Sequence, residues 1–185
     1  MRMLKYLWLT LFAYSLAIQS ANADSFGYSN LLDGRPAITI QTTPPMVTSG
    51  DRAVNANFCK DGAAFTCFTS EWISFSFPKK MSVTPSEWSE NGFLFKRSDL
   101  TTVQVFGVCH EAYKVTSNQN GREFNFLYSL SHGLLGFSVE IDNQKLTYIA
   151  QNSAGFGAAR GVENLQPKNP KKEKSSRDEQ FSGCS

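Results

Sequence analysis

The sequence has few of the residues on which familiar catalytic and metal centres depend. It contains two histidines in 185 residues. It also lacks a G-x-S-x-G nucleophile motif, an H-E-x-x-H zinc motif, a glycine-rich phosphate loop and a paired-glycine dinucleotide fingerprint. These absences lower the expectation of an enzyme, and the sequence predicts no cofactor and no metal site.

Neither sign of charge dominates the chain. The 18 Lys and Arg side chains and 16 Asp and Glu side chains give a formal net charge of +2, which does not indicate a nucleic-acid partner. Outside the N-terminus, no apolar run approaches the roughly 20 residues that a membrane-spanning helix requires. We therefore expect no nucleic-acid partner and no transmembrane span in the mature protein, and the oligomeric state stays open.

Residues 1–23 have the layout of a secretory signal peptide. Two basic residues precede the apolar segment Tyr6–Ile18, and small side chains occupy Ala21 and Ala23, where a signal peptidase would cut. An uncleaved membrane anchor is the alternative, which the short apolar segment disfavours. The prediction is export to the periplasm or the exterior after cleavage following Ala23, with a mature protein that begins at Asp24.

All four cysteines lie in the predicted mature chain. In an oxidising compartment an even number of cysteines indicates disulfides. Cys59 and Cys67 enclose a short, turn-like segment, so we expect them to pair and to leave Cys109 for Cys184. Because seven residues rather than two to four lie between the first two cysteines, a zinc site is disfavoured.

Aromatic side chains are abundant, with 15 Phe, 6 Tyr and 3 Trp, and they alternate along short segments as strands require. The clearest case is the segment 111–151, where turn residues at Asn118–Gly121, Ser131–Leu134 and Asp142–Lys145 separate four alternating segments. These segments predict a four-stranded antiparallel meander.

The registers of the meander follow from keeping apolar side chains on one face. For the first hairpin we consider closure on Asn120-Gly121. We place Leu130 opposite Leu135 in the second hairpin and Ile141 opposite Leu146 in the third.

Upstream, similar but shorter segments bring the expected total to eight or nine short strands. The run Thr101–Val108 is apolar on both faces at its end, which indicates a central or doubly covered strand. Pro85–Trp88 is a candidate helix start. The predicted fold class is all-β, a small antiparallel sandwich or barrel.

The domain organisation follows from these patterns. Residues 24–165 are predicted to form one β domain. Residues 166–180 contain no apolar side chain except two prolines and mix both signs of charge, so 166–185 is predicted to be a disordered charged tail ending in a cysteine. Its lysines could form a basic patch, but the interleaved acidic residues favour a solvated tail.

The meander also suggests one chemical cluster. Closing the first hairpin on Asn120-Gly121 places His110 opposite Ser131, beside His132. With Glu111, the two imidazoles would then meet at one end of the sheet, where they could act as general acid and base or hold a weakly bound metal. The alternative is a strand-end histidine and a loop histidine without a chemical role.

Three aromatic residues are weak candidates for binding. Trp72 is out of phase with the alternation that follows it, and Trp72 and Trp88 could anchor a partner at the surface; core filling is the alternative. Phe156 lies in the glycine-rich segment Asn152–Ala159, which is either a ligand loop or a crossover that packs this ring into the core.

These features leave three hypotheses. The favoured one is an exported, non-enzymatic, disulfide-bonded β domain that binds a protein or envelope component. In general plan it is similar to small exported inhibitors and immunity proteins of bacterial envelopes, without a motif specific to them. The alternatives are a small β-barrel that binds an apolar ligand inside, and a hydrolase that uses His110, Glu111 and His132.

Overall fold

The computed structural model describes residues 24–32, 37–60, 62–80, 86–105, 107–159 and 184. The predicted signal peptide and the predicted tail, apart from Cys184, lie outside the described residues. Within the described ranges, no helix is long and apolar enough to cross a membrane.

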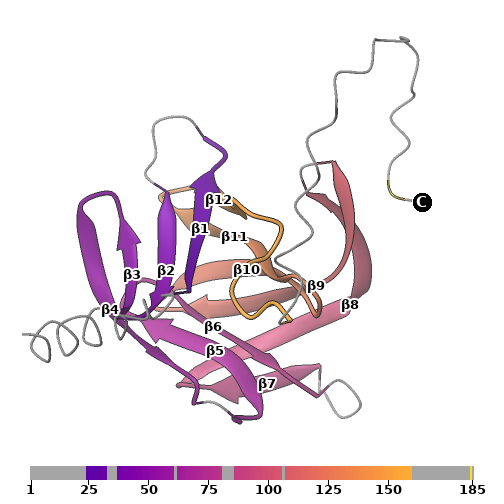
Figure 1. Cartoon of the computed structure of the whole chain (residues 1–185), viewed down its shortest axis with the longest axis horizontal. Helices are drawn as coiled ribbons and strands as arrows, with labels where there is room; N and C mark the ends of the chain where they lie inside the picture. The colour runs from indigo at the N-terminus through magenta and orange to yellow at the C-terminus, as the bar shows by residue number, and fades with distance from the viewer. Residues whose placement is uncertain are drawn as a thin grey trace, which may run out of the picture.

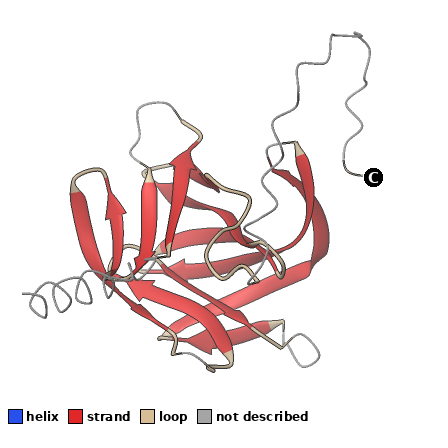
Figure 2. Cartoon of the chain, viewed as in Figure 1, coloured by secondary structure: helices blue, strands red, loops and turns tan. Residues whose placement is uncertain are grey.

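The described residues form strands joined by turns and loops (Figure 2). The strands are β1 (Ser25–Asn30), β2 (Ile38–Thr42), β3 (Pro45–Ser49), β4 (Arg52–Phe58), β5 (Phe65–Ser70), β6 (Ser74–Pro78), β7 (Glu87–Glu90), β8 (Phe93–Val105), β9 (Val108–Gln119), β10 (Arg122–Ser129), β11 (Gly133–Ile141) and β12 (Gln144–Ala150). They make one antiparallel sheet in the order β6-β5-β4-β3-β2-β1-β12-β11-β10-β9-β8-β7, which curls into a nearly closed barrel (Figure 1).

This architecture confirms the all-β antiparallel fold class, with twelve strands in the described ranges instead of eight or nine. The additional strands are short, and apolar and polar side chains alternate only weakly along them. β3 begins with a proline, and β7 has four residues, of which one is buried. The expected helix start is wrong in its last two residues, because Glu87 and Trp88 belong to β7 and pair with β8.

The C-terminal meander is present as β9 to β12. Its first hairpin has the predicted register, with Arg122 opposite Gln119 around Asn120-Gly121. In the third hairpin Phe137 lies opposite Tyr148, two residues from the expected partner. The reason is a tight turn in which Asp142 and Asn143 both adopt positive φ, 50° and 61°.

The second hairpin also differs by two residues over most of its length. Phe126 pairs with Phe137, and a bulge after Leu127 shifts the register before the turn. Because a shift by two keeps each side chain on its face, the core side of the meander is nevertheless the predicted one.

The prediction of a central or doubly covered strand at Thr101–Val108 is wrong. β8 ends at Val105 and β9 begins at Val108, with a turn at Gly107, whose φ is 78°. The side chain of Val108 is 54% exposed. The segment is therefore the end of the β8–β9 hairpin and not a covered strand.

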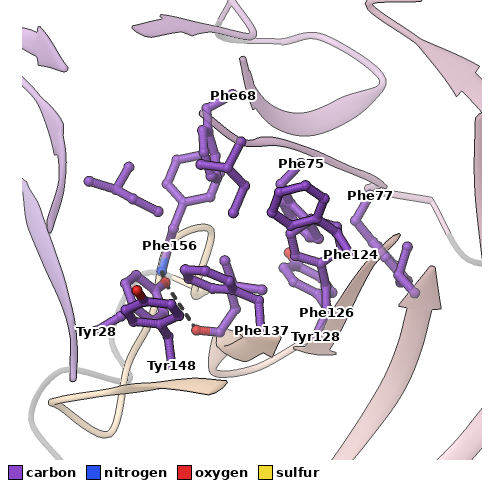
Figure 3. Packing of buried hydrophobic residues seen from close by; sticks show 14 of the residues in the cluster. Tyr28, Phe68, Phe75, Phe77, Phe124, Phe126, Tyr128, Phe137, Tyr148 and Phe156 are labelled. Carbon is purple, nitrogen blue, oxygen red and sulfur yellow. Dashed lines mark hydrogen bonds between the residues drawn. The ribbon is translucent and has the colours of Figure 1, made fainter. Parts of the chain in front are cut away.

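Aromatic rings fill the interior (Figure 3). Phe77 stacks on Tyr128 with ring centroids 4.4 Å apart, and Phe75 lies 5.1 Å from Phe126. Stacked and tilted ring pairs at such centroid distances stabilise a core beyond the area that they bury. The high Phe content therefore serves a packed core, at least over the described residues.

Side chains close the barrel where the two end strands β6 and β7 meet, a place we call the seam. Gln119 at the end of β9 accepts a hydrogen bond from the Ser74 N–H (2.9 Å) and donates one to the Ser74 carbonyl (2.6 Å) on β6. Trp88 on β7 donates its indole N–H to Ser76 Oγ on β6 (3.3 Å). Since β6 and β7 share no backbone ladder within the described pairings, these contacts connect the two ends of the sheet.

Candidate functional site

Both expected disulfides are present, Cys59–Cys67 and Cys109–Cys184. Two disulfides indicate an oxidising, extracellular compartment. The Glu90 carboxylate lies within 4.8 Å of the Cys59 and Cys67 sulfurs. Because these sulfurs are bonded to each other, they are not thiolate ligands, and this group does not form a metal site.

The structure brings the two histidines together. His110 on β9 and His132 in the β10–β11 turn have ring centroids 4.6 Å apart and planes inclined by 79°. The Nδ1 atom of His132 lies 2.8 Å from Ser131 Oγ, which in turn lies 3.2 Å from Ser129 Oγ. The hydroxyls therefore form a short chain that ends on the imidazole of His132.

The imidazole of His110 is buried. His110 is 7% exposed, and its Nδ1 is buried without a hydrogen-bond partner among the described residues. Burial lowers the pKa of His110 below its usual value, and the neighbouring imidazole of His132 lowers it further. Both effects favour the neutral form of the His110 ring.

Glu111 is not part of this cluster, which corrects the predicted three-residue site. Neighbouring residues of a strand point to opposite faces of the sheet, so Glu111 points away from the face that carries His110, and it is exposed. Glu111 is therefore not the carboxylate that would orient His132 as a catalytic base.

The two tryptophans lie in different surroundings. Trp88 is 6% exposed, stacks on Phe95 and meets Phe77 edge-on, so it belongs to the seam and offers no surface anchor. Trp72 is half-buried, and the guanidinium of Arg52 lies over its ring at 5.6 Å from the centroid. A partner that docked on this face of Trp72 would have to displace that arginine.

The segment Asn152–Ala159 crosses the end of the barrel and packs Phe156 into the core. The ring of Phe156 meets those of Phe68, Phe58 and Phe26 at centroid distances of 5.1, 5.6 and 5.8 Å. The buried Tyr28 hydroxyl accepts a hydrogen bond from the Phe156 N–H and donates one to the Leu134 carbonyl. The segment is thus a packed crossover and not an open ligand loop.

The described residues also form a hollow of about 200 Å³. It lies on the outer face of β9 to β12, between Lys114 and Lys145, and not inside the barrel. Together with the aromatic packing of the interior, this position gives no support to an internal apolar ligand.

A feature that the sequence analysis missed is the far end of the β8–β9 hairpin, which we call the arm. The arm consists of Ser98–Val105 of β8 and Val108–Ala112 of β9, and Figure 1 shows it extending past the neighbouring strands. β7 pairs with β8 only from Phe93 to Lys96. Within the described part of the chain, Ser98–Val105 therefore has a strand on one side only.

Backbone directions along the arm follow from one hydrogen bond. The Lys114 N–H donates to Ser98 Oγ at 3.2 Å, so the backbone groups of Lys114 point toward β8. These directions alternate along an antiparallel strand. The partners of the even-numbered β9 residues are the odd-numbered residues of Thr101–Val105. The N–H and C=O groups of Thr102 and Gln104 therefore point away from β9, to the unpaired edge.

Comparisons with known proteins found no match: no family model, no curated protein and no solved structure matches the chain.

Proposed function

We propose that the chain is an exported, non-enzymatic binding domain that pairs an extended segment of a partner protein with the edge of β8 at Thr102 and Gln104. The observation that carries this proposal is the unpaired edge of the arm. Strand addition to an open sheet edge is a common mode of peptide recognition, in which main-chain hydrogen bonds supply affinity.

Among the described residues, the arm lacks the protection that the other edges of the sheet have. Natural proteins protect edge strands with charges, short lengths or covering side chains. β7 is four residues long and carries Glu87 and Glu90, and the edge of β6 is bonded by Gln119. The segment Leu100–Val108 contains no charged residue and no proline. Its composition therefore leaves the edge open to another strand.

The same composition indicates the chemistry of the partner segment. The arm offers threonine, valine and glutamine at Thr101–Val105, without a charge to pair with. An extended, uncharged segment rich in β-branched residues fits such an edge. Its backbone can hydrogen-bond to the edge along its length, and its side chains can pack against those of the arm. The predicted signal peptide and the two disulfides agree with an extracellular or periplasmic partner.

Photo-cross-linking in the protein's own host tests this proposal. A photoreactive residue at position 104 is expected to give one discrete adduct with a protein. Thr102→Pro should reduce the yield by about fivefold or more, because proline removes the outward N–H and blocks the edge while the bonds to β9 remain. Thr102→Val, which keeps the N–H, should leave the yield unchanged.

The position of the cross-linker supplies a second control. A photoreactive residue at Lys145, on the outer face of β12, should not give the same adduct. An adduct of two copies of this chain would keep the edge pairing but replace the foreign partner with a second copy. Equal yields from the proline and valine variants would contradict strand addition.

A further inference from the structure

We propose that His110 and His132 together bind one divalent transition-metal ion, with Cu²⁺ bound most tightly. This inference is independent of the proposed strand addition. The sequence analysis names a weakly bound metal as one possible role of this histidine pair, although it predicts no metal site. The two imidazoles come from different elements, β9 and the β10–β11 turn, and their ring centroids are 4.6 Å apart. One ion between the rings could contact a nitrogen of each.

The burial of His110 and the missing hydrogen bond at its Nδ1 indicate that this nitrogen binds a metal ion. Its side chain is more than nine-tenths buried, yet Nδ1 has no hydrogen-bond partner among the described residues. Buried polar atoms normally have a partner, and each exception calls for a specific explanation. A metal ion would use the lone pair of Nδ1.

The ring of His132 is held in one orientation, as is usual for a metal-binding histidine. Its Nδ1 is held by Ser131 Oγ at 2.8 Å, which leaves Nε2 as the nitrogen available to a metal. Ser131 is itself placed by Ser129 Oγ, and Ser129 is 2% exposed. Metal-binding histidines characteristically bond their second ring nitrogen to such an outer partner, which fixes the orientation of the ring.

The ligand set decides the class of metal. Imidazole nitrogen suits Cu²⁺, Ni²⁺ and Zn²⁺, and affinity for a given nitrogen site rises through the series to Cu²⁺. Two protein ligands leave positions for water, in contrast to a closed structural zinc site with four. We therefore expect a partly hydrated site that binds Cu²⁺ more tightly than Zn²⁺.

The test uses untagged protein that begins at Asp24, titrated with Cu²⁺ without a reducing agent. Because the chain contains two histidines, coupling to imidazole nitrogen in the electron paramagnetic resonance spectrum reports only on these residues. The wild-type spectrum should show two imidazole nitrogens at one equivalent of Cu²⁺. His132→Gln should show one nitrogen and bind at least about tenfold more weakly.

Ser131→Ala separates positioning from ligation. It should retain both nitrogens while the affinity falls by about tenfold, since the outer partner of His132 is lost. A variant that lacks both histidines gives the baseline for copper bound by the N-terminal amine and backbone, and thermal melts confirm that each variant is folded. Should His110 variants not fold, His132→Gln, in a turn, provides the decisive comparison. Equal affinity and equal spectra in wild type and His132→Gln would overturn the proposal.

Discussion

Replacing Gly155 with alanine is expected to lower the free energy of unfolding by about 3 kcal/mol, the upper end of the usual cost of overpacking. A Cβ atom at this position would overlap the backbone carbonyl oxygen of Leu134 and come within 3.1 Å of the Tyr28 hydroxyl. Backbone atoms of β11 cannot move aside as a flexible side chain can. The crossover segment would have to lift, which would withdraw Phe156 from the core.

Thermal and urea unfolding of the two alanine variants Gly155→Ala and Gly27→Ala measures this effect. Gly27→Ala is the matched control, because its added Cβ would meet the side-chain end of Gln151, which is exposed and can rotate away. For a domain of this size, 3 kcal/mol corresponds to a loss of about 10 °C in Tm. If the two variants unfold at the same temperature, the crossover is not packed as described.

Replacing Gln119 with leucine is expected to cost a similar amount, about 3 kcal/mol, because two buried backbone groups lose their partners. Gln119 is 3% exposed, and its side-chain amide satisfies both the N–H and the carbonyl of Ser74. Leucine has a similar size but cannot form either bond. The edge of β6 would then be left unpaired at the seam.

The neighbouring residue on the opposite face provides the control for this second prediction. Asn118 is exposed, and Asn118→Leu should change Tm by no more than about 1 °C, since exposed substitutions are usually near neutral. Amide hydrogen exchange should also show faster exchange at Ser74 in Gln119→Leu than in wild type. Unchanged exchange at Ser74 would show that the glutamine does not hold the seam.

Local rules predicted part of this structure well. The turn at Asn120-Gly121 set the register of its hairpin correctly, and that register placed His110 near His132. The other two hairpins were misplaced by two residues, because alternation of apolar side chains is the same after such a shift. Turn geometry at Asp142-Asn143 decides the partner, and alternation alone does not contain it.

Other features depend on contacts that sequence spacing does not show. Glu111 was grouped with His110 because the two are adjacent in the sequence, although adjacent strand residues face opposite ways. Nothing in the sequence indicates that Gln119 hydrogen-bonds to Ser74, since these residues are far apart along the chain. The uncharged run Leu100–Val108 looks the same whether a strand is covered or open. Only the sheet order shows that no strand of the described ranges pairs with its outer side.

Amide hydrogen exchange of the arm tests the central claim, an open edge on β8, most directly. In the isolated protein that begins at Asp24, the account predicts fast exchange at Thr102 and Gln104 and slow exchange at Thr101 and Val103, whose N–H groups point to β9. The difference in exchange rate between the outward and inward N–H groups should stay the same when the protein is diluted. Slow exchange at Thr102 and Gln104, equal to that of their neighbours at every protein concentration, would show that the edge is already occupied and would contradict the account.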